Sequence, residues 1–146
     1  MNLRTTLTIT SLLSLVLFSF HLADDIVRGI EKGTWDDLGA FVIFFVWICG
    51  ALLLRERPLG YAIMLLGSVL SAAVPILHMS GNGIGVDSRI GGTPNAFFFV
   101  WTLLAMGITG PLGVVLSLRL LWESFGRGKR VRRDGMVTDL RRAFCI

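Results

Sequence analysis

Residues 59–80 read LGYAIMLLGSVLSAAVPILHMS, a run of small and apolar residues without any Asp, Glu, Lys or Arg. The hydrocarbon core of a bilayer is ~30 Å thick, and about 20 helical residues cross it. Three further uncharged runs of similar length occupy Thr5–Leu22, Leu38–Leu54 and Ala96–Leu118. One such run could be the core helix of a soluble domain, but the remaining polar chain is too short to bury four. The pattern therefore predicts an integral membrane protein.

The composition agrees with this prediction. Hydrophobic residues make up 53% of the 146 residues and charged residues 16%, whereas a soluble domain carries about 25% charged residues. Short connections make consecutive helices antiparallel neighbours. The predicted fold is therefore all-α: an integral membrane antiparallel four-helix bundle in residues 1–125, followed by a basic cytoplasmic tail in residues 126–146.

The positions of the basic residues predict the orientation of the bundle. Of the 14 lysines and arginines, only Arg28, Lys32 and Arg89 fall on the side that holds the first and third connections. The others lie near the termini or in the second connection, and the positive-inside rule places that side in the cytoplasm. We therefore expect both termini to be cytoplasmic, with the chain integral to the plasma (bacterial inner) membrane.

The segment Gly126–Arg133 reads GRGKRVRR and follows the last apolar run. Such clusters attract anionic lipid headgroups at ~1 kcal/mol per basic residue. Nucleic acid is not an expected partner, because the segment offers no aromatic platform on which bases could stack. Membrane lipids, with anionic headgroups at the basic tail, are the predicted non-protein partners.

Two of the runs carry polar or small residues on one helical face, at steps of three, four or seven residues. In and just beyond the first run these are Thr10, Ser14, His21, Asp24, Asp25 and Arg28. In the third run they are Gly67, Ser68, Ser71, Pro75 and His78. Because small residues let helix backbones approach closely in lipid, we expect both faces to point into the protein.

His21 and His78 are the two histidines of the chain, and each is expected near the outer end of an outward-running helix. Ionisable side chains at membrane depth are costly and mark functional sites. Imidazole and carboxylate groups suit divalent metals, so one predicted metal site comprises His21, Asp24, Asp25 and His78. Alternatively, the histidines hold a haem or a pigment between helices, or exchange protons. In the simplest interpretation they only form hydrogen bonds, to each other or to Asp24.

The fourth run contains irregular features. Pro111 lacks the N–H of a regular helix, which predicts a kink. Phe97, Phe98 and Phe99 are consecutive and cannot all face one small bundle, so at least one points outward. The preceding connection, Ser80–Asn95, is rich in glycine but lacks the sequence of a phosphate-binding loop.

None of these patterns is a recognisable catalytic or transport signature, and an enzyme is not expected. The leading expectation is a non-catalytic accessory or scaffolding subunit that packs against other membrane protein subunits or against copies of itself. Short connections, small-residue faces and surplus aromatic residues favour it. The first alternative is a metal-, haem- or pigment-binding membrane protein that uses His21 and His78. The second is a small oligomeric transporter or channel.

Overall fold

The computed structural model describes residues 2–29, 34, 38–79 and 96–144, and within them it contains four helices and no strand. The helices are α1 (Leu3–Val27), α2 (Leu38–Leu52), α3 (Pro58–Met79) and α4 (Ala96–Phe144). The all-helical prediction is confirmed. The glycine-rich connection Ser80–Asn95 lies outside the described residues.

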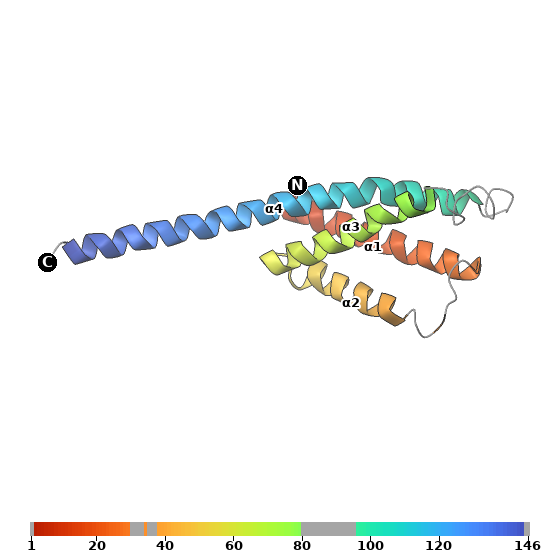
Figure 1. Ribbon diagram of the computed structural model, residues 1–146, viewed down its shortest axis with the longest axis horizontal. Coiled ribbons are helices and arrows are strands. Elements are labelled where there is room, and N and C mark those ends of the chain that lie inside the picture. The colour runs from red at the N-terminus through yellow and green to blue at the C-terminus, as the bar shows by residue number, and fades with distance from the viewer. Residues whose placement is uncertain (1, 30–33, 35–37, 80–95, 145–146) are drawn as a thin grey trace.

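The chain direction alternates from one helix to the next, so α1 and α3 run one way and α2 and α4 the other (Figure 1). α3 packs against each of the other three helices, most extensively against α4. α1 also contacts α2 and α4, whereas α2 and α4 do not touch within the described residues. The helices therefore form an antiparallel bundle in which α2 is peripheral.

Three helices, α1, α3 and α4, are long and apolar enough to cross a membrane. α2 has only 15 residues, which at ~1.5 Å per residue corresponds to about 22 Å and falls short of the ~30 Å of hydrocarbon. It ends at Leu52 rather than at the predicted Leu54, because the backbone N–H groups of Leu53 and Leu54 both bond to the Cys49 carbonyl, at 2.9 and 3.1 Å. Membrane-spanning length is thus supported for three of the four predicted spans.

Local sequence explains where α1 and α3 begin. The side chain of Asn2 accepts a hydrogen bond from the Arg4 N–H at 3.4 Å and caps α1. Pro58 is the first residue of α3, a position where the missing N–H is no loss. In the short turn before it, the Arg57 N–H bonds to the Leu54 carbonyl at 2.9 Å. This turn holds α2 and α3 together as the expected hairpin.

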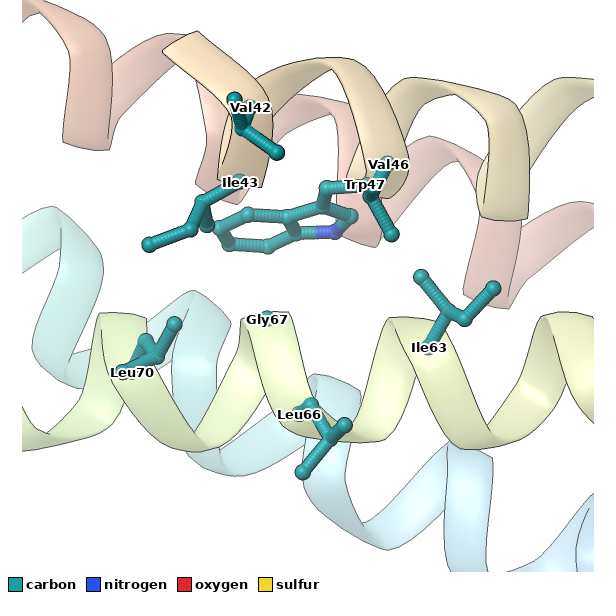
Figure 2. Close-up of a pocket in the computed structure, with 8 residues that line it drawn as sticks. All are labelled: Val42, Ile43, Val46, Trp47, Ile63, Leu66, Gly67 and Leu70. Atoms are coloured by element: carbon teal, nitrogen blue, oxygen red, sulfur yellow. The ribbon is translucent and has the colours of Figure 1, made fainter. Parts of the chain in front are cut away.

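Glycine permits close packing on two sides of α3. The indole ring of Trp47 lies over Gly67, where any Cβ atom would collide with the ring (Figure 2). Trp47 is 1% exposed, and its Nε1–H donates to the Ser11 hydroxyl at 2.7 Å, which ties α2 to α1. Against α4, a Cβ on Gly110 would come within 2.6 Å of the Ala72 backbone nitrogen. Gly67 therefore makes room for an indole ring, and Gly110 lets the backbones of α3 and α4 approach closely, as small residues do in membrane helices.

The interior of the bundle mixes apolar core clusters with polar side chains, whereas much of its surface is apolar. Among the described side chains, the buried polar ones are Thr10, Ser11, Ser14, His21, Asp25, Ser68, Ser71, His78, Thr102 and Ser117. Many large apolar side chains are exposed instead, as a surface in contact with lipid tails requires. The prediction that the polar faces of the first and third runs point inward is confirmed, except that Asp24 and Arg28 are only half-buried.

α4 is one continuous helix of 49 residues (Figure 1), about 74 Å long at ~1.5 Å per residue. Pro111 lies inside this helix, which continues to Phe144 through most of the segment predicted as a basic tail. Near its start, Phe99 is fully buried while Phe97 is 79% exposed. The prediction that these phenylalanines cannot all face the bundle is confirmed.

Candidate metal site

Three of the residues predicted as metal ligands lie together between α1 and α3. His21 and Asp25 are one turn apart on α1, and His78 is the penultimate residue of α3. They are 3%, 6% and 8% exposed, respectively. One ligand atom from each lies within 4.8 Å of the other two. Two histidines and a carboxylate are a ligand set that suits divalent transition metals.

The distances within this cluster suit a shared cation better than direct hydrogen bonds. Asp25 Oδ2 lies 3.7 Å from His21 Nε2 and 3.6 Å from His78 Nε2. An N–H···O hydrogen bond is shorter, at 2.7–3.2 Å. Two ligand atoms that each bind one zinc-like ion at ~2.1 Å, with a tetrahedral angle between them, lie about 3.4 Å apart. Both measured distances are close to this separation.

A hydroxyl group on α4 determines which nitrogen of His21 can bind a cation. Thr102 Oγ1 donates its hydrogen to the Phe99 carbonyl at 2.9 Å. It therefore accepts at its 3.1 Å contact with His21 Nδ1, which assigns the hydrogen of the neutral ring to Nδ1. The lone pair is left on Nε2, the His21 nitrogen nearest Asp25. Within the described residues, this Nε2 atom has no hydrogen-bond partner. A hydrogen bond of this kind on the second ring nitrogen orients metal-binding histidines.

Phe99 contacts both imidazoles of the cluster. Its ring centroid lies 4.8 Å from that of His21 and 5.3 Å from that of His78. The Arg28 guanidinium carbon lies 5.5 Å from the same ring centroid, within cation–π range. Phe99 is fully buried, so its ring forms an apolar wall against both imidazoles.

Asp24, the fourth predicted ligand, is not part of the cluster. Its Oδ2 accepts from Arg28 Nε at 2.7 Å, an ion pair one turn apart on α1. Consecutive residues point about 100° apart around a helix with 3.6 residues per turn. Since Asp25 faces His78, Asp24 is directed elsewhere.

The arrangement of the two histidines does not favour a haem or a pigment held between them. The imidazole rings contact each other edge to face, with 4.9 Å between centroids and an angle of 82°. A macrocycle ligated from both sides needs imidazoles on its opposite faces, with the ring plane between them. Direct contact between the rings leaves no such gap, so a single ion fits this cluster better.

The chain matches no known family model, no curated protein and no solved structure.

Proposed function

We propose that this chain is an integral membrane protein that binds one divalent transition-metal ion through His21, Asp25 and His78. The observation that carries the proposal is the convergence of three buried ligand atoms from two helices within 4.8 Å. An ion bound there joins α1 to α3. Asp25 supplies negative charge, and the histidines supply neutral nitrogen ligands.

In the membrane, the proposal places both termini in the cytoplasm and the metal cluster near the outer face. Support comes from the basic residues, most of which lie at the end of the bundle opposite the histidines. All four helices cross the bilayer in this arrangement. α2, at about 22 Å, does so with local thinning of the bilayer, one of the ways in which short spans are accommodated.

The nature of the ligands restricts the ion. Imidazole and carboxylate together suit zinc, iron, copper or cobalt(II), whereas magnesium and calcium prefer oxygen ligands alone. Cobalt(II) is a convenient probe, because it binds in the same geometry as zinc and is coloured.

The test is a cobalt titration of the full-length protein, purified in detergent, with metal content measured independently by mass spectrometry. We expect one cobalt ion per chain. Asp25→Asn should weaken binding at least about tenfold, because the amide supplies no negative charge. Asp24→Asn is the matched control: it removes the adjacent carboxylate, which pairs with Arg28, and should leave the affinity unchanged.

Two results would overturn the proposal. One is a wild-type protein that binds no transition metal in stoichiometric amount. The other is an equal loss of affinity in Asp24→Asn and Asp25→Asn, which would mean that binding depends only on nearby negative charge and not on coordination by Asp25.

A second candidate function is the accessory subunit favoured by the sequence. Supporting it, Phe97 and Trp101 of α4 are 79% and 56% exposed, and their rings stack at 6.4 Å between centroids. Such a rigid aromatic pair suits contact with another membrane helix. Crosslinking from Trp101 in native membranes, with a photoreactive side chain at this position, should capture a defined protein partner. Capture of lipid alone would contradict this second function.

A further inference from the structure

A polar pocket lies at the end of the bundle opposite the metal cluster. It has a volume of ≈ 270 Å³ and lies between the first turns of α1 and the turn that joins α2 to α3. Its lining includes Arg4 and Thr5 from α1 and Arg55 and Glu56 from the turn. Arg4 precedes His21 by about five helical turns, or ~25 Å, so the pocket and the metal cluster are separate sites.

The charges in this lining favour a monoanion. Arg4 and Arg55 contribute two positive charges and Glu56 one negative charge, a net charge of +1. Arg55 Nη2 lies 3.8 Å from Glu56 Oε1, beyond hydrogen-bond range, and both side chains are about two-thirds exposed. Exposed pairs of this kind are weak, so the Arg55 guanidinium remains able to bind a stronger anion.

The first turn of α1 adds to the positive potential of the pocket. The N-terminal end of a helix carries a partial positive charge, and here α1 begins at Leu3, directly beside Arg4. A phosphate group is the anion best matched to guanidinium groups at such a helix end, since arginine binds phosphate oxygens in pairs.

An apolar path leads away from the pocket along the outer face of α1. Ile9 lines the pocket and is 52% exposed. Leu13, Val16 and Phe20 follow at steps of three or four residues and are 49%, 43% and 54% exposed. Residues at these steps form one continuous stripe on a helix. A lipid whose phosphate lies between the two arginines would extend an acyl chain along this stripe.

We propose that the pocket formed by Arg4, Thr5 and Arg55 binds the phosphodiester headgroup of an anionic phospholipid. The charge of −1 on that group balances the net charge of the lining, and the stripe from Ile9 to Phe20 receives the chain. This proposal is independent of the metal site.

The test is a lipid titration of the purified full-length protein, with bound lipid counted by native mass spectrometry. The probes are phosphatidylglycerol, which is anionic, phosphatidylcholine, which is zwitterionic, and inorganic phosphate. We expect phosphatidylglycerol to bind more tightly than phosphatidylcholine. Arg4→Gln and Arg55→Gln should each weaken its binding about fivefold, as expected for one basic residue near a lipid headgroup.

Matched variants separate a specific pocket from general positive charge. Arg57→Gln removes a charge from the same turn but not from the pocket lining, and it should leave phosphatidylglycerol affinity unchanged. Arg55→Lys keeps the charge but cannot bind two phosphate oxygens in parallel, so it should retain more affinity than Arg55→Gln and less than the wild type. Circular dichroism and thermal unfolding without lipid confirm that each variant is folded.

Equal losses in Arg4→Gln, Arg55→Gln and Arg57→Gln would overturn the proposal, because binding would then depend on net charge alone. Equal affinities for phosphatidylglycerol and phosphatidylcholine would also overturn it. Displacement of phosphatidylglycerol by inorganic phosphate at comparable concentration would contradict the lipid assignment and indicate a site for free phosphate.

Discussion

Replacing Thr102 by valine removes a single hydroxyl group while keeping the shape of the side chain. That hydroxyl accepts from His21 Nδ1 at 3.1 Å and donates to the Phe99 carbonyl at 2.9 Å. His21 is 3% exposed, so water does not replace the lost partner. A buried donor left without a partner costs about 1–3 kcal/mol. Thr102→Val should therefore lower the free energy of unfolding by this amount.

The same substitution should weaken metal binding. Loss of a hydrogen bond that orients a metal-binding histidine typically lowers affinity about 10–100-fold, which corresponds to about 1.4–2.7 kcal/mol. The expected loss of binding free energy is thus similar in size to the expected loss of folding stability, so the two quantities have to be measured separately. Affinity is measured by cobalt titration in detergent with a competing chelator, and stability is measured by thermal unfolding of the metal-free protein.

Thr109→Val is the matched control for this prediction. Thr109 lies seven residues further along α4, and its buried hydroxyl oxygen has no hydrogen-bond partner within the described residues. The control should leave cobalt affinity unchanged. Unchanged affinity in Thr102→Val, or an equal fall in both variants, would refute the argument that Thr102 orients His21.

Two further predictions concern packing. Gly110→Ala should destabilise the protein by about 1–3 kcal/mol, because the new Cβ would lie 2.6 Å from the Ala72 backbone nitrogen; Gly107→Ala, with Pro75 at 3.8 Å as its nearest neighbour, should be nearly neutral in the same thermal unfolding assay. Phe99→Ala should cost about 3–5 kcal/mol and also weaken cobalt binding, whereas Phe97→Ala, at a residue 79% exposed, should affect neither measurement. Equal effects within either pair would contradict the contacts described for Gly110 and Phe99.

Hydropathy was sufficient to predict the helices, but not their lengths. Uncharged runs of about 20 residues follow from the thickness of the membrane, and α1, α3 and α4 agree with that rule. The end of α2 depends on two N–H groups that share the Cys49 carbonyl, a detail of the turn that hydropathy does not contain. The continuation of α4 to Phe144 was not predicted, because hydropathy follows only the apolar run, which ends at Leu118.

The site was partly predictable because helical spacing restricts which residues can meet. His21 and His78 were each expected near the outer end of a helix, and the polar faces predicted that they point inward. Helical periodicity could not predict which of Asp24 and Asp25 faces the histidines, because these adjacent residues both lie near the same polar stripe. Only the position of α3, with His78 beside Asp25 Oδ2 at 3.6 Å, makes that choice.

The contribution of α4 to the site was missed for a different reason. Thr102 is 81 residues away from His21 in the sequence, and nothing near either residue indicates the pairing. A signal was nevertheless present in the spacing of Phe99, Thr102, Leu103 and Met106, all of which are buried. These positions follow the i, i+3, i+4, i+7 pattern of one helical face. The pattern was hard to recognise because Phe97, Phe98 and Phe99 are equally apolar. Hydropathy alone therefore does not tell which of the three belongs to the buried face.

α4 is a single helix from Ala96 to Phe144, so a displacement of its C-terminal half can reach the residues near its start. Thr102, which touches His21, and the basic segment Gly126–Arg133 belong to the same helix. An axial shift of this helix would move Thr102 relative to α1. Sliding by the rise of one residue, ~1.5 Å, would be enough to stretch the 3.1 Å contact between Thr102 Oγ1 and His21 Nδ1 beyond hydrogen-bond range. A force that pulls on the C-terminal half of α4 along its axis would therefore change the hydrogen bond that orients the His21 imidazole near the other end of the helix.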